Sequence, residues 1–149
     1  MARVIEAPEY YYGETPALFL AGGITGCLNW RAEVIKHLED LDIAILNPMR
    51  SNFDTKNKGM AKEQIHWEFH HLRRADSILF WFPKETDCPI SLFELGAWTA
   101  QTKRLFVGVD PDYSRRLDIE IQLQLIKPQI MISYTLPDLA FYVRDRWLH

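Results

Sequence analysis

Short apolar runs alternate along this chain with longer segments in which apolar residues recur at helical spacing. Each run is apolar nearly throughout, which is typical of buried strands, and the first three are followed by glycine or proline. The five runs cover residues 17–21, 43–46, 77–82, 105–109 and 129–132. The pattern therefore predicts five strands separated by helical segments.

The helical segments follow from the same pattern. Asn29 is a suitable N-cap for a helix ending near Asp40. A helix over residues 61–75 has Ile65, Phe69 and Leu72 on one face. Three further helices are predicted over residues 91–102, 114–126 and 136–147, while residues 6–15 form a polar lead-in and residues 50–59 a polar loop.

Alternation of strands and helices indicates parallel βαβ units, and uniformly apolar strands indicate a sheet that is covered on both faces. We therefore predict an α/β fold, a three-layer, doubly wound arrangement around a five-stranded parallel sheet. The chain has 149 residues, about one domain's worth, and contains no linker and no internal repeat. A single domain over residues 1–149 is expected.

Composition narrows the classes of function. The net charge of −3 provides no basic field for a nucleic-acid polymer or an anionic membrane surface. No uncharged apolar run approaches the roughly 20 residues that span a bilayer. Cys27 and Cys88 are too few for a disulfide scaffold, and His66 and His70 do not form the H-E-x-x-H zinc motif. We expect a cytoplasmic protein with reduced thiols, no metal and no cofactor.

Open parallel sheets bind ligands in the crevice at the carboxyl ends of their strands. That rule nominates the loops at residues 22–29, 47–53, 83–90 and 110–114. Gly22 and Gly23 would allow a ligand close to the backbone, although a tight turn that needs glycine explains them equally well. Asn47 and Arg50 flank the second loop and are candidates to hydrogen-bond a base or a sugar.

Acidic residues near the third loop suggest two interpretations. Ser91 and Glu94 have the spacing of a capping box, which requires no function and is favoured by the spacing alone. A carboxylate in the first turn, facing the crevice, would also be held ionised by the helix dipole, as a nucleophile must be. Asp87 faces the same crevice or is a solvated loop residue, whereas Asp76 lies at the amino end of its strand. Paired carboxylates can divide attack and proton donation between them.

Four short motifs follow one another along the chain. They are Phe19-Leu20-Ala21-Gly22-Gly23-Ile24, Asn47-Pro48-Met49-Arg50, Ala75-Asp76-Ser77-Ile78-Leu79-Phe80 and Phe93-Glu94-Leu95-Gly96-Ala97. Together they resemble the nucleoside 2-deoxyribosyltransferase family and its nucleotide-hydrolysing relatives over roughly Ala17 to Val109, and Glu-Leu-Gly is the most specific element. The resemblance implies a flavodoxin-like sheet and cleavage of the N-glycosidic bond between a deoxyribose and a nucleobase.

The resemblance also implies roles for individual residues. Glu94 would attack the anomeric carbon, and the covalent deoxyribosyl group would then pass to another base or to water. Asp76 and Asp87 would hold or protonate the base. Family members are commonly oligomers whose neighbouring subunits complete the site, so a homo-oligomer is implied.

Two positions depart from the family pattern. Phe19 stands where better-known members have a tyrosine, so a hydrogen bond that orients the glutamate is missing, and Tyr10, Tyr11 or Tyr12 would have to replace it. Cys88 stands where relatives that take 5′-monophosphates have a serine, which argues against recognition of a phosphate.

The leading hypothesis is thus an enzyme that cleaves a (deoxy)nucleoside by transfer or hydrolysis. The alternatives are a non-catalytic nucleotide-binding or sensing module, with Glu94 as a cap only, and a hydrolase of a larger N-riboside such as a dinucleotide. The candidate site comprises Glu94, Asp76 and Asp87 as catalytic residues and Gly22, Gly23, Phe19, Asn47 and Arg50 as substrate-binding residues.

Overall fold

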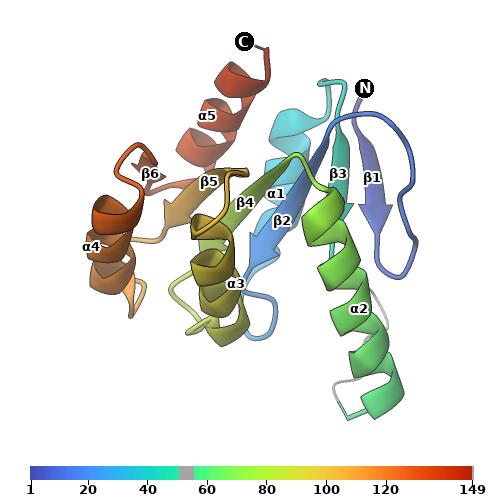
Figure 1. Cartoon of the computed structure of the whole chain (residues 1–149), viewed down its shortest axis with the longest axis horizontal. Helices are drawn as coiled ribbons and strands as arrows, with labels where there is room; N and C mark the ends of the chain where they lie inside the picture. Colours follow the sequence, from blue (N-terminus) through green and yellow to red (C-terminus); the bar gives the residue numbers. More distant parts are fainter. Residues whose placement is uncertain (51–55, 149) are drawn as a thin grey trace.

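The computed structural model describes residues 1–50 and 56–148 and contains, in that part of the chain, a six-stranded parallel sheet and five helices (Figure 1). The strands are β1 (Arg3–Glu6), β2 (Ala17–Gly22), β3 (Ala44–Asn47), β4 (Ser77–Phe82), β5 (Arg104–Val109) and β6 (Ile132–Ser133). The helices are α1 (Trp30–Leu38), α2 (Lys58–Arg74), α3 (Pro89–Thr99), α4 (Arg116–Ile126) and α5 (Leu136–Leu148). None of these helices is long and apolar enough to cross a membrane.

The helices form a layer on each face of the sheet, whose strand order is β1-β3-β2-β4-β5-β6 (Figure 1). Alternate side chains of β2 belong to two separate cores. Leu18 and Leu20 pack with α1 and α5, while Phe19 and Ala21 pack with α2, α3 and α4. The predicted three-layer α/β fold of the flavodoxin-like type is therefore confirmed, with six strands in place of five.

The additional strand, β1, lies at an edge of the sheet and pairs with β3 through registers such as Ile5 with Leu46. Only Val4 and Ile5 are apolar in its four residues, so the sequence shows no alternating pattern there. The flanking Arg3 and Glu6 are exposed, and charged residues are common on edge strands because they discourage pairing with another chain. The other edge strand, β6, is shorter than the predicted run.

Residues 7–16 join β1 to β2 and must cross β3, because β3 lies between those two strands. Two hydrogen bonds to side chains of α2 hold this segment in place. Trp67 Nε1 donates to the Glu9 carbonyl at 2.6 Å, and the Tyr11 amide donates to His71 Nε2 at 3.0 Å. His71 Nδ1 lies 2.7 Å from the Trp67 carbonyl, which can only accept. His71 is therefore a neutral imidazole with its proton on Nδ1, and it is fully buried.

Replacing His71 tests how much its hydrogen bond with the Tyr11 amide contributes to stability. Burial lowers the pKa of His71, whereas the unfolded chain binds the proton near pH 6.5, so the stability that His71 contributes is lost as pH falls below about 6.5. We expect His71→Gln to be less stable than the parent by about 1–3 kcal/mol at pH 7.5, with a difference that narrows by pH 5. Urea unfolding at both pH values measures it. The exposed His66→Gln serves as control, and a difference for His71→Gln that is the same at both pH values would contradict the assignment.

Candidate active site

A cavity of about 330 Å³ opens at the carboxyl edge of the sheet, where the sequence places the ligand crevice. Three of the four nominated loops line it, through Gly22–Thr25 after β2, Pro48 after β3 and residues between 86 and 91 after β4. Two acids from the helices, Glu68 of α2 and Glu94 of α3, complete the lining. The fourth loop, residues 110–114, does not line this cavity, and residues 51–53 of the second loop lie outside the described residues.

The glycine loop approaches its surroundings so closely that no side chain fits. Gly22 has a φ of 146°, and a Cβ atom there would lie 2.2 Å from the Trp81 carbonyl oxygen. A Cβ atom on Gly23 would lie 2.8 Å from side-chain atoms of Pro83 and Thr86. Gly22 is thus required by its backbone conformation and its approach to β4, and Gly23 by its packing against Pro83 and Thr86; both also line the cavity.

Arg31, on α1, hydrogen-bonds to the backbone of this loop from its buried side. Its side chain is 2% exposed, and its guanidinium donates to the carbonyls of Leu20 at 3.1 Å, Gly22 at 3.1 Å and Gly23 at 2.9 Å. Burial lowers the pKa of Arg31 to about 10, and the nearby charges of Glu68 and Glu94 oppose that change. A fixed cation therefore lies at the cavity wall. Sequence reasoning missed it because a lone arginine in a helix resembles any surface charge.

Glu68 and Glu94 form a carboxyl pair in the cavity, and both are half-buried. Burial raises the pKa of Glu94 to about 8, the charge of Glu68 adds to the rise, and Arg31 opposes it. Burial also raises the pKa of Glu68, against a hydrogen bond with Gln64 and the charge of Arg31. With the pKa of Glu94 at about 8, a proton remains on this pair near neutral pH.

Glu68 was not among the residues expected from the sequence, because the helical phase of α2 was placed incorrectly. Ile65 and Phe69, expected on the buried face, are exposed, whereas Gln64, Trp67 and His71 are buried. The face that carries Ile65 and Phe69 therefore looks toward α3, and Glu68 lies on it. The one signal in the sequence for Glu68 was its position between Ile65 and Phe69 on that apolar face.

The start of α3 also differs from the expectation. The helix begins at Pro89, a residue favoured at the first helical position, and Cys88 precedes it with a φ of 50° and no side-chain cap. Ser91 is the third helical residue and Glu94 lies in the second turn. The capping-box prediction is therefore wrong, and so is the prediction that the helix dipole holds Glu94 ionised, since its pKa is raised.

The structure does not bring Asp76 or Asp87 to the carboxyl pair. Asp76 is exposed at the amino end of β4, where Oδ2 accepts from the Ala17 amide at 2.8 Å and from Arg74 at 3.3 Å. The six residues of β4 separate it from the cavity by about 20 Å. Asp87 is also exposed, and its Oδ1 accepts from the Ser114 hydroxyl at 2.7 Å.

The aromatic residues near the cavity leave the missing hydroxyl unreplaced. Phe19 lines the cavity, is fully buried and lies 6.0 Å from the Trp67 ring centroid. Tyr10, Tyr11 and Tyr12 do not line it, and the Tyr11 hydroxyl donates to the Thr15 carbonyl. The suggestion that one of these tyrosines substitutes for the family tyrosine is therefore wrong.

The two polar candidates after β3 are engaged elsewhere. Asn47 is buried, and its Oδ1 accepts from the Met49 amide at 3.1 Å, which closes a local turn. The Arg50 guanidinium forms an ion pair with Glu63 at 2.7 Å. Pro48, between them, is the residue of this motif that lines the cavity.

The cysteines and the metal-binding side chains offer no further chemistry at this cavity. Both thiols are free, and burial raises the pKa of Cys88 to about 12 and that of Cys27 in the same direction. Thiols of this kind are poor nucleophiles because little thiolate forms near neutral pH. Within residues 1–50 and 56–148, no three His, Cys, Asp or Glu side chains lie together as a metal site.

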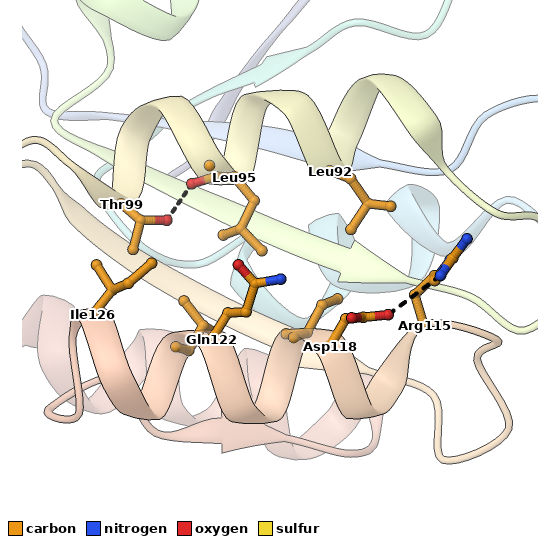
Figure 2. A pocket seen from close by; sticks show the side chains of 10 residues that line it. Leu92, Leu95, Thr99, Arg115, Asp118, Gln122 and Ile126 are labelled. Atoms are coloured by element: carbon orange, nitrogen blue, oxygen red, sulfur yellow. Dashed lines mark hydrogen bonds and ion pairs between the residues drawn. The ribbon is translucent and has the colours of Figure 1, made fainter.

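A separate cavity of about 360 Å³ lies between α3 and α4 and contains none of the predicted acids (Figure 2). Leu92, Leu95 and Thr99 face it from α3, and an ion pair between Arg115 and Asp118 lies at one end. Gly96 also lines it, and a Cβ atom there would meet nothing within 4 Å. The glycine of Glu-Leu-Gly therefore relieves no close contact in the isolated chain.

The chain matches a known protein family. A family model described as "Nucleoside 2-deoxyribosyltransferase like" matches residues 15–113, more than half of the chain. The matched region contains the glycine loop, α2 and the Glu94 segment of α3. No curated protein matches the chain significantly.

The electrostatic coupling of the carboxyl pair is directly measurable. Glu68→Gln removes the neighbouring negative charge, so we expect the pKa of Glu94 to fall below its parent value of about 8. Titration of the ¹³C-labelled glutamate side-chain carboxyls by NMR, with the Glu94 signal identified by its absence in Glu94→Gln, measures the change. Glu120→Gln, on α4, should leave that pKa unchanged. An unaltered or higher pKa for Glu94 in Glu68→Gln would show that the two carboxyls do not interact.

Proposed function

The chain belongs to the nucleoside 2-deoxyribosyltransferase-like family, and on that basis we propose that it cleaves the N-glycosidic bond of a (deoxy)nucleoside through Glu94. The observation that supports this most strongly is the pairing of Glu94 with Glu68 in one cavity, beside a glycine loop and a buried cation. Two carboxyl groups with raised pKa values are suited to one ionised and one protonated role.

In the proposed reaction the sugar occupies the cavity at the carboxyl edge of the sheet, with its anomeric carbon next to Glu94. The Glu94 carboxylate forms a bond to that carbon while the bond from carbon to the base nitrogen breaks. The electron pair of the broken bond goes to the base, which receives the proton from the Glu68 carboxyl. A second base or a water molecule then attacks the anomeric carbon, gives its proton to Glu68 and releases the Glu94 carboxylate.

The raised pKa of Glu94 favours its protonated form in the free protein, so this division of roles requires the proton to move from Glu94 to Glu68 before attack. Attack requires ionised Glu94 and protonated Glu68, a state that holds the same single proton as the reverse arrangement. Arg31 favours ionisation of both groups and lies against the loop that would hold the sugar. Positive charge that develops on the sugar during bond cleavage further favours a negative Glu94.

The proposal changes the residues that were expected to assist Glu94. Glu68 takes the role of holding or protonating the base that the resemblance implied for Asp76 and Asp87, because Glu68 lines the cavity with Glu94 and those two aspartates do not. Gly22, Gly23 and Phe19 remain proposed contacts of the substrate. Asn47 and Arg50 are instead proposed to stabilise the loop after β3, through the Met49 amide and Glu63. Cys88 replaces the serine of phosphate-taking relatives, so we propose an unphosphorylated nucleoside as the substrate.

We further propose that the chain forms a homo-oligomer through α4. Leu117, Ile121 and Leu125 are all exposed and recur every fourth residue, so they form one apolar stripe along the outer side of this helix. The buried stripe of the same helix contains Ile119 and Leu123. A second apolar stripe on a helix whose core-facing side is already buried is typical of an interface with another subunit.

Glu94→Gln tests the catalytic proposal. We expect the variant to release no base from any nucleoside that the parent cleaves, because the amide cannot form the covalent bond. Glu68→Gln should lose most of the activity, and Asp76→Asn should keep it. Mass spectrometry of mixtures with nucleosides, monophosphates and dinucleotides, with and without a second free base, measures base release and exchange. Exchange indicates a transferase and release alone a hydrolase.

Stability serves as the control for that experiment. The unfolded chain ionises Glu94 near pH 4.5 and the folded chain near 8, so the folded state loses stability as pH rises between these values. Glu94→Gln should therefore melt no lower than the parent at pH 7. Full activity of Glu94→Gln, or silence of the parent across the whole panel, would contradict the proposal, and silence would favour a binding module.

Leu125→Glu tests the interface. We expect the parent to sediment as an oligomer and the variant as a monomer, because the substitution places a charge in the apolar stripe. Phe141→Glu, which changes an equally exposed apolar residue of α5, should sediment like the parent. Sedimentation velocity over a range of concentrations distinguishes them. A monomeric parent at every concentration would rule out the proposed oligomer.

A further inference from the structure

A groove of about 630 Å³ runs between α2 and α3 and meets the active-site cavity at the carboxyl pair. Glu68, Ile90 and Glu94 line both spaces, so the two carboxyls lie at their junction. With the sugar in the active-site cavity, a base that leaves from the anomeric carbon is directed into this groove. This placement of the leaving base rests on the proposed function.

The walls of the groove are aromatic. Phe69 of α2 is 56% exposed and Phe93 of α3 is 75% exposed, and Trp98 lies one turn beyond Glu94. Since a helix rises 1.5 Å per residue, Trp98 is displaced by about 6 Å along α3 from Glu94. Aromatic side chains that line a groove offer surfaces against which a planar ring can pack, and Phe93 is the most exposed of the three.

The far end of the groove is positively charged. The Arg73 guanidinium lies 3.6 Å from the Phe69 ring centroid and 5.8 Å from that of Trp98. In the part of the chain that the structure describes, it makes no hydrogen bond and no ion pair. Lys103 adds a second cation, with Nζ 4.4 Å from the Trp98 centroid, and donates to the carbonyls of Leu72 and Arg73.

These charges contrast with the acidic balance of the whole chain, which has a net charge of −3. Burial lowers the pKa of Lys103, and the neighbouring charges of Arg73 and Arg74 act in the same direction, while Asp76 opposes them. The Asp76 carboxylate is itself engaged with Arg74. Arg73 is thus a cation held on an aromatic face without an acidic partner, about 7.5 Å along α2 from Glu68.

We propose that the groove between α2 and α3 is the subsite of the leaving base, and that it selects a planar aromatic base with an anionic substituent on the edge away from the sugar. The Arg73 guanidinium already lies on the Phe69 ring and near Trp98, so the base ring packs against Phe93, at the side of these three stacked groups. The substituent reaches Arg73, whose guanidinium is free to form charge-assisted hydrogen bonds with it. The substrate class is therefore a nucleoside of a carboxylated or similarly anionic base.

Binding of free bases tests this subsite without any reaction. Isothermal titration calorimetry on the whole protein compares 5-carboxyuracil with uracil, which differ only in the carboxylate. We expect 5-carboxyuracil to bind at least about fivefold more tightly at low salt, with a preference that weakens as salt is added. Arg73→Gln should remove the preference and leave uracil binding unchanged. Arg115→Gln, which alters an exposed arginine at the separate cavity between α3 and α4, should keep the preference.

The outcomes separate this subsite from the catalytic proposal, because free bases contain no glycosidic bond. A preference that depends on Arg73 supports the subsite even if Glu94→Gln still releases base. Equal affinity for the two compounds, or a preference that Arg73→Gln retains, overturns the subsite even if Glu94 is the nucleophile. Failure of both compounds to bind, together with loss of self-association in Arg73→Gln, assigns the groove to a second copy of the chain and also overturns it.

Discussion

A buried guanidinium holds the loop and supplies the positive charge at the wall of the candidate active-site cavity. Arg31 donates to the carbonyls of Leu20, Gly22 and Gly23 at the end of β2, and these bonds hold the loop in a conformation in which a side chain at position 22 would clash with the Trp81 carbonyl. A charge so deeply buried is favourable only with such hydrogen bonds and with nearby negative charge. Glu68 and Glu94 supply that negative charge, so the loop and the carboxyl pair depend on the same cation.

The carboxyl pair follows from how the helices cover one face of the sheet. Trp67 and His71 anchor α2 to the core and to residues 7–16, which turns its Ile65 and Phe69 face toward α3. Glu68 is thereby brought opposite Glu94, and a groove remains between the helices. The hydrogen bonds between α2 and residues 7–16 therefore also help to set the position of Glu68 in the cavity.

The sequence predicted features that depend on local pattern and missed those that depend on tertiary contacts. Apolar runs identified the central strands, and the carboxyl-edge rule identified the loops at the cavity. The phase of α2 was misplaced because its buried face contains His71 and its exposed face Phe69. Asp76 was selected by its position in a motif, although the length of β4 separates it from Glu94. Glu68 was missed because its place between Ile65 and Phe69 indicates a site only once that face is known to look toward α3.

The most direct test of the central claim is the chemical identity of the reaction intermediate. A cleavable nucleoside with fluorine at C2′ of the sugar slows release of a covalent glycosyl ester, so the protein can be digested and its peptides mapped by mass spectrometry. We expect the mass of the fluorinated sugar on Glu94 in the parent and no label in Glu94→Gln. Label on another residue, or base release by the parent without any label, would contradict the assignment of Glu94 as the nucleophile.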